Sequence, residues 1–168
     1  MSFRLLIADD EPGILKFLRR ELERDESLRI CGEAMDGSQA VVKAQELRPD
    51  LIILDLAMPF MNGIDAARKI RTTLPKTPII LFTLTDFPEV RSQAAKAGIQ
   101  GVVAKRDGIG SLQAAIESAL SQIKKADSVI VSSDIATPNS SLEAASADAE
   151  GRTLAPAIDP KDVIPETS

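Results

Sequence analysis

An uninterrupted apolar run that stops at a single carboxylate is the feature that most constrains the fold. Residues 51–54 read Leu-Ile-Ile-Leu and are followed directly by Asp55, with Pro59 a few positions later. A short apolar run without alternation is typical of a strand buried on both faces, as in a parallel sheet covered by helices. Pro59 cannot donate to a sheet ladder, so the strand ends before it. We therefore expect Asp55 at the carboxyl end of a buried strand, where open parallel sheets bind their ligands.

Strand and helix patterns alternate five times before Lys125. The expected strands cover residues 4–8, 28–34, 51–55, 79–83 and 101–104. Helical periodicity follows each strand, and the helices are expected to begin near Pro12, Asp36, Asn62, Pro88 and Ile109, the last ending at about Lys125. This alternation predicts an α/β fold, a doubly wound sheet of five parallel strands with helices on both faces.

The composition changes after Lys125. Residues 126–168 are rich in Ala, Ser, Asp and Pro, and their eight acidic and two basic residues give a net charge of −6, against +1 for residues 1–125. Such a segment buries too little apolar surface to order itself, so we expect one domain over residues 1–125 and a mostly disordered acidic tail over residues 126–168. A near-neutral body and an acidic tail argue against direct nucleic-acid binding. No run approaches the ~20 apolar residues of a membrane span, and no signal peptide is recognisable, so we expect a cytoplasmic protein.

Polar side chains stand at four of the expected strand ends. Asp9 and Asp10 follow the first strand, Asp55 ends the third, Thr83 ends the fourth, and Lys105 follows the fifth. Parallel strands bring these positions to one edge of the sheet. Three carboxylates in one cleft repel one another, so either a pKa rises or a cation lies among them, and hard oxygen ligands suit Mg²⁺. An ammonium and a hydroxyl suit phosphate oxygens, so the group favours phosphoryl transfer with a carboxylate as nucleophile.

These motifs resemble the receiver domain of two-component response regulators. The resemblance covers residues 3–125 and is carried by Asp9-Asp10-Glu11-Pro12, by the run of residues 49–59 with Asn62-Gly63, and by Thr83 and Lys105. It implies the CheY-like strand order 2-1-3-4-5. The body is most similar to receivers of the NarL/LuxR type, which normally carry a helix-turn-helix. No such pattern follows here, so we expect a stand-alone receiver.

The resemblance also implies roles for the acidic residues. Asp55 resembles the phosphoacceptor, which takes a phosphoryl group from a histidine of a sensor histidine kinase. Asp10 corresponds to the direct magnesium ligand, with Asp9 acting mainly through water. Asp55 itself and the backbone carbonyl of Ala57 correspond to the remaining protein contacts to the metal. The implied cofactor is therefore Mg²⁺.

The remaining two site residues link the cleft to the surface. By the same resemblance, Thr83 and Lys105 hold the phosphoryl oxygens, and Thr83 moves inward on phosphorylation. That movement couples the site to the face formed by the fourth helix, fifth strand and fifth helix, the family's usual dimerisation surface. The implied partners are the kinase and a downstream protein, with the signal passed on through protein–protein contact.

Besides Arg106, which stands where the family often has a proline, two positions depart from the family pattern and leave alternatives open. Val102 stands where the family has an aromatic switch residue, and Leu84 stands where it usually has a small residue. Either Leu84 restricts access to Asp55 and slows its chemistry, or both are neutral packing variants. A pseudo-receiver, an interaction module that is never phosphorylated, is the alternative function. A magnesium-dependent phosphatase needs a second carboxylate two residues after the nucleophile, where this chain has Ala57, so we do not expect an enzyme.

Overall fold

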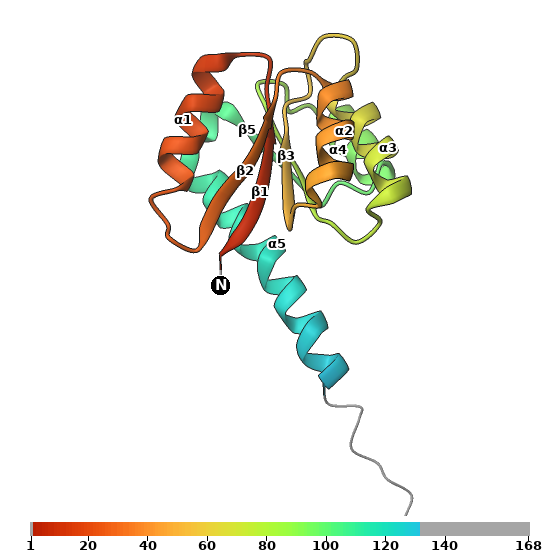
Figure 1. The fold of residues 1–168 in the computed structure, drawn as a ribbon. Helices are drawn as coiled ribbons and strands as arrows, with labels where there is room; N and C mark the ends of the chain where they lie inside the picture. The colour runs from red at the N-terminus through yellow and green to blue at the C-terminus, as the bar shows by residue number, and fades with distance from the viewer. Residues whose placement is uncertain (1, 132–168) are drawn as a thin grey trace, which may run out of the picture. The chain divides into compact units, whose positions relative to one another are not determined.

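A computed structural model describes residues 2–131 of the chain, with side chains described to residue 125. Strands and helices alternate along it (Figure 1). The elements are β1 (Phe3–Ala8), α1 (Pro12–Leu22), β2 (Leu28–Ala34), α2 (Gly37–Leu47), β3 (Leu51–Leu54), α3 (Gly63–Thr73), β4 (Ile79–Thr83), α4 (Pro88–Lys96), β5 (Gly101–Ala104), a 3₁₀ turn (Lys105–Asp107) and α5 (Gly108–Val131). The five strands pair in parallel in the order β2-β1-β3-β4-β5. The predicted fold class and strand order are confirmed.

Two layers of helices bury the sheet on both faces. Helices α1 and α5 cover one face, and α2, α3 and α4 cover the other (Figure 1). Successive side chains of β3 enter the two cores alternately: Ile53 packs under α1 and α5, whereas Ile52 and Leu54 pack under the opposite helices. This explains why β3 is apolar without alternation, since both of its faces are interior. None of the helices within residues 2–131 is long and apolar enough to span a membrane.

Capping residues fix where several helices begin and end. The Asp36 side chain accepts a hydrogen bond from the Gln39 N–H at 2.8 Å, which caps the start of α2. Pro88 opens α4, where its missing N–H costs nothing. Gly98, with φ of +74°, follows the end of α4. These are the positions at which the sequence predicts the boundaries.

The last helix is longer than the sequence predicts. Helix α5 continues to Val131, six residues into the segment that we expected to form the tail. The chain has neither Gly nor Pro between Gly110 and Pro138, so no strong helix breaker lies near Lys125. The rest of the expected tail, residues 132–168, lies outside the described residues.

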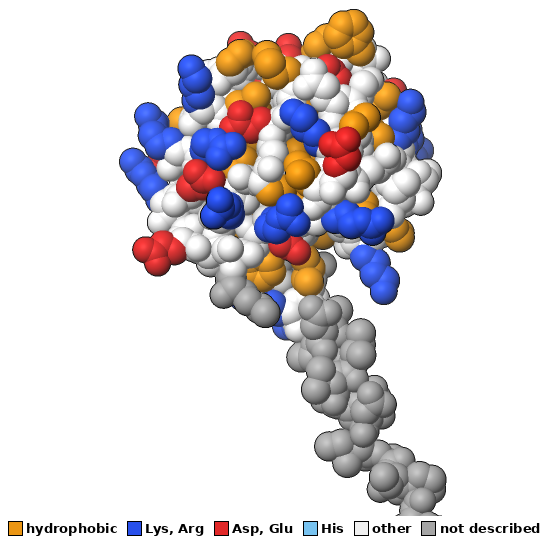
Figure 2. Space-filling model, viewed as in Figure 1, with side chains coloured by type: hydrophobic (Ala, Val, Ile, Leu, Met, Phe, Trp, Pro, Cys, Tyr) orange, Lys and Arg blue, Asp and Glu red, His pale blue; other side chains and the backbone are white. Residues whose placement is uncertain are grey.

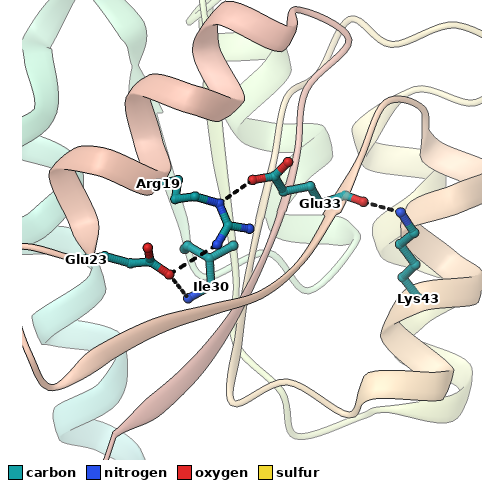
Figure 3. Close-up of polar contacts among 5 residues, drawn as sticks. All are labelled: Arg19, Glu23, Ile30, Glu33 and Lys43. Atoms are coloured by element: carbon teal, nitrogen blue, oxygen red, sulfur yellow. Dashed lines mark hydrogen bonds and ion pairs between the residues drawn. The ribbon is translucent and has the colours of Figure 1, made fainter.

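A network of polar side chains covers the outer strand β2 (Figure 3). Arg19 of α1 donates from Nε to Glu33 Oε1 at 2.7 Å and lies 3.3 Å from Glu23 Oε1. Glu23 in turn accepts the backbone N–H of Ile30 at 3.1 Å, and Lys43 of α2 donates to the Glu33 carbonyl. Exposed ion pairs of this kind add little stability, but together with the Lys43 hydrogen bond they tie both flanking helices to the edge strand.

Strand β2 also contains an irregularity. Its pairing with β1 jumps from Ile30 opposite Leu5 to Gly32 opposite Leu6, which leaves Cys31 as an extra residue. A bulge of this kind bends the strand locally and breaks the regular ladder.

Candidate functional site

Four of the predicted site residues converge at the carboxyl edge of the sheet. Carboxylate oxygens of Asp9, Asp10 and Asp55 lie within 4.8 Å of one another. Lys105, which follows β5, brings its Nζ to 2.6 Å from Asp9 Oδ2 and 3.4 Å from Asp55 Oδ1. The side chains come from loops after β1, β3 and β5, so the parallel topology alone accounts for their meeting.

Most of the site is buried, and we refer to the buried group of Asp9, Asp55 and Lys105 as the recess. Asp9 and Asp55 are only 1% and 5% exposed, and the Lys105 side chain is 11% exposed. Asp10, by contrast, is exposed and faces solvent from the rim of the group. A reactant must therefore reach Asp55 from above the sheet edge, past the loops that follow the strands.

Backbone contacts hold the two buried carboxylates in place. The Asp55 N–H donates to the Ala8 carbonyl at 2.8 Å, and Asp55 Oδ2 accepts the N–H of Ala57 at 3.1 Å. Asp9 Oδ1 accepts the N–H of Glu11 at 3.0 Å. These bonds fix both side chains before any ligand arrives.

The loop after Asp55 is folded back so tightly that it needs a glycine. A Cβ on Gly63 would lie 2.1 Å from the Asp55 carbonyl oxygen. The Gly63 N–H donates to the Leu56 carbonyl at 3.0 Å, which closes the loop at the start of α3. The loop geometry and the position of Asp55 are thus linked through one backbone contact.

Burial and charge shift the acid–base properties of the recess. Burial raises the pKa of Asp55, and the Asp9 charge adds to the rise, while the Lys105 ammonium opposes it. Burial lowers the pKa of Lys105, but its hydrogen bond to Asp9 and the Asp55 charge outweigh burial, so this pKa is raised. Three carboxylates and one ammonium leave the site with excess negative charge.

The donor set fits a hard divalent cation. Its potential ligands are carboxylate oxygens, which Mg²⁺ prefers, and the exposed position of Asp10 leaves room for the water ligands that Mg²⁺ usually keeps. Burial is the main cause of the raised pKa of Asp55, and a cation there would offset the further rise that the Asp9 charge causes.

Thr83 and Leu84 lie at the end of β4, the strand beside β3. Thr83 is 1% exposed, and its hydroxyl oxygen accepts the Thr85 N–H at 3.2 Å. Leu84 is 73% exposed, so its side chain projects into solvent. The sequence could not tell which way Leu84 points, because its strand continues directly into an irregular loop.

One buried charged residue of this region was missed by the sequence analysis. The Asp86 side chain is 7% exposed, and its Oδ2 lies 2.6 Å from Arg91 and 3.7 Å from Arg106. It therefore links the loop after β4 to α4 and to the 3₁₀ turn after β5. The only sequence signal was an acidic residue shortly before the helix-opening Pro88.

The strand order and the acidic cleft at the point where that order reverses define a flavodoxin-like α/β protein. Within that class the family is established by sequence: residues 5–117 match the response regulator receiver domain. The chain belongs to this family.

Individual relatives of the chain have different names and match it over different shares of their length. The chain is 38% identical over 118 residues to a protein-glutamate methylesterase/protein-glutamine glutaminase of Nocardioides, covering 69% of this chain and 32% of the relative. It is 35% identical over 140 residues to the transcriptional regulatory protein PdtaR of Mycobacterium tuberculosis, covering 83% of this chain and 66% of the relative. The chain thus spans about a third of the methylesterase and about two thirds of PdtaR.

Solved structures agree with the family assignment. A LuxR-family two-component response regulator from Aurantimonas superposes with a TM-score of 0.70 at 31% identity, covering 73% of this chain and 87% of that one. The response regulator domain of CheB from Thermotoga maritima gives a TM-score of 0.63 at 31% identity, covering 74% of this chain and 96% of that one. The similarity to CheY-like and NarL/LuxR-type receivers is confirmed.

Proposed function

We propose that the chain is a phosphoacceptor in which Asp55 receives a phosphoryl group from a phosphohistidine of a sensor histidine kinase. The observation that carries the proposal is the position of Asp55. It is a buried carboxylate at the end of the central strand, 3.4 Å from the Lys105 ammonium and grouped with two further carboxylates. Membership in the receiver family supports phosphorylation-based signalling in general.

The transfer uses the recess as follows. An Asp55 carboxylate oxygen attacks the phosphorus, the P–N bond of the donor breaks, and its electron pair returns to the imidazole nitrogen, which takes a proton from water. Lys105, within reach of Asp55, holds one phosphoryl oxygen, and Thr83 donates its hydroxyl to another. When bound by Asp9, Asp10, Asp55 and the Ala57 carbonyl, Mg²⁺ supplies positive charge that offsets the carboxylates and the phosphoryl group.

The same arrangement argues against the other functions considered. A pseudo-receiver would have no need of a buried carboxylate held between an ammonium and two further acids. The methylesterase relatives match this chain over only about a third of their length. The role that the arrangement around Asp55 supports for this chain is that of a phosphoacceptor.

The wider context follows from the same proposal. Residues 1–125 form the receiver, with its last helix continuing to Val131, and an acidic segment follows. The phosphorylated form passes its signal to a downstream protein without binding nucleic acid directly. The face of α4, β5 and α5 is the proposed surface for that partner or for a second copy of the chain. A kinase donor implies action in the cytoplasm.

Intact-mass spectrometry after incubation with acetyl phosphate and Mg²⁺ tests the proposal. We expect the wild-type chain to gain the mass of one phosphoryl group, the Asp55→Asn variant to gain none, and a chelator to abolish the gain in the wild type. No gain in the wild type, or the same gain in Asp55→Asn, would refute the assignment of Asp55.

A further inference from the structure

Exposed apolar side chains gather in the loops that surround the acidic recess. Five large apolar side chains of the described body are exposed, and three of them, Phe60, Leu84 and Phe87, belong to the loops after the adjacent strands β3 and β4. Figure 2 shows apolar side chains along the sheet edge that these loops form, whereas Lys, Arg, Asp and Glu intermingle over the neighbouring face. We call Phe60, Leu84 and Phe87 the apolar rim.

Phe60 is the strongest member of the apolar rim. Its ring is 93% exposed, and its backbone adopts a left-handed conformation with φ of 62°. A bulky residue is disfavoured in that conformation, and this ring gains no compensating burial. Gly or Asn would satisfy the same turn at lower cost, so the folded domain alone does not explain the choice of phenylalanine.

The reaction at Asp55 dictates what approaches the apolar rim. Asp55 lies in a recess and is 5% exposed, and the imidazole of a protein donor must enter that recess on a short side chain. The protein surface around the donor histidine must then come into contact with the loops on either side. Phe60 follows Asp55 by five residues in one of these loops, and Leu84 follows the buried Thr83 in the next.

The surroundings of the apolar rim restrict the chemistry of that surface. The recess carries excess negative charge and so repels acidic groups beside the donor histidine. A hollow beside Phe60 is lined by Met58 and Met61, whose flexible side chains adapt to an inserted apolar group, and by the polar side chains of Asn62, Asp65, Arg68 and Lys69. Burying Phe60 and Leu84 against apolar side chains would remove from water the two large apolar side chains of this edge with the highest exposed fractions.

We propose that the apolar rim docks the phosphodonor protein through apolar, non-acidic side chains that surround the donor's histidine. This inference rests on the proposed function, and it assigns partner recognition to the loops after β3 and β4. A small phosphodonor enters the recess without touching the rim. The rim therefore determines the rate of transfer from a protein and not the intrinsic reactivity of Asp55.

Phosphotransfer from two kinds of donor tests this docking. Histidine kinase domains from the same genome are autophosphorylated and screened with the full-length chain, and the fastest donor is used for kinetics. The variants are Phe60→Asn, which keeps a residue that tolerates the left-handed backbone, and Leu84→Ser and Phe87→Ser. Val42→Ser removes an exposed apolar side chain of α2 outside the two loops and is the matched control.

We expect Phe60→Asn to slow transfer from the kinase by about tenfold or more, the effect of losing a central interface residue. Leu84→Ser and Phe87→Ser should each slow it by a smaller factor, and Val42→Ser should leave it unchanged. Labelling by acetyl phosphate should stay within about twofold of wild type in all four variants, because this small donor reaches Asp55 without contacting the apolar rim.

Several outcomes would overturn the docking proposal. An unchanged rate of transfer from the kinase in all three rim variants would overturn it. Equal slowing of transfer from the kinase and from acetyl phosphate would also overturn it, because the rim would then act through the position of Asp55. Labelling by acetyl phosphate without transfer from any kinase would also refute docking of a kinase at the rim. So would a wild-type dimer that Phe60→Asn converts to a monomer without affecting transfer from the kinase, because the rim would then bind a second copy of the chain. Failure of the wild type to accept any phosphoryl group would instead refute the proposed function itself.

Discussion

Replacing Gly63 by alanine should destabilise the domain through a single backbone clash. The added Cβ would lie 2.1 Å from the Asp55 carbonyl oxygen and 3.1 Å from Leu81 Cδ2, whereas ordinary contacts begin at 3.4 Å. The loop and the strand end must therefore separate by about 1.3 Å, and a backbone oxygen cannot rotate aside as a side chain can. Forcing an extra carbon into a packed site costs about 1–3 kcal/mol, and the backbone partner puts this case near the upper value.

Urea unfolding measures that loss. With a slope of about 1–3 kcal/mol per molar urea, a loss of about 2–3 kcal/mol lowers the midpoint by about 1 M. The domain should stay folded in water, because typical domains have about 5–15 kcal/mol of stability. Labelling by acetyl phosphate should slow as well, since the displaced carbonyl belongs to Asp55.

Gly110→Ala is the matched control for the same substitution in another helix. A Cβ at Gly110 meets nothing within 4 Å, so alanine should raise stability by about 0.5–1 kcal/mol through helix propensity alone. If Gly63→Ala shifted the midpoint upward like Gly110→Ala, the loop would not be held by the contact with Asp55, and the reasoning would be refuted.

Three further predictions concern the titrating groups of the chain. Burial raises the pKa of Asp55 above its ordinary 3.8, so the folded wild type loses stability as pH rises from that value through the raised pKa. Asp55→Asn should therefore have a higher melting temperature than wild type at neutral pH without Mg²⁺. An equal or lower melting temperature would contradict the raised pKa. Mg²⁺ should stabilise the folded wild type by about 2.7 kcal/mol at a hundred times its dissociation constant and so raise its melting temperature. An equal rise in Asp10→Asn would exclude this acidic group as the binding site. Burial raises the pKa of the single cysteine, Cys31, so Ellman's reagent should react more slowly with the folded chain than with the urea-unfolded chain, and equal rates would show that the thiol is freely accessible.

Most of the fold was predictable because its boundaries are encoded locally. The ends of β2, β4 and β5 fall at the predicted residues, where turn residues, prolines or charges interrupt the apolar runs. Strand β3 ends at Leu54, one residue before the predicted end, because Asp55 already turns toward the loop. The end of α5 could not be predicted, since no glycine or proline near Lys125 marks it.

The site was predictable where topology alone decides it and not where side-chain direction matters. Asp9, Asp55 and Lys105 had to meet, because parallel strands end at a common edge. The exposure of Leu84 and the burial of Asp86 depend on the path of an irregular loop, which carries no periodic signal. The roles of the converging residues in catalysis and metal binding remain predictions for the experiments above.

The polar network over β2 has a consequence for the behaviour of the sheet in concentrated solution. An open sheet presents an unpaired ladder at its outer strand, and such edges can recruit strands from other molecules and lead to fibrils. Here the Ile30 N–H is already bound by Glu23, the Glu33 carbonyl already accepts Lys43, and the bulge at Cys31 breaks the register that an incoming strand would need. Side chains of two helices thus occupy hydrogen-bonding groups that β2 would otherwise offer to an aggregating neighbour.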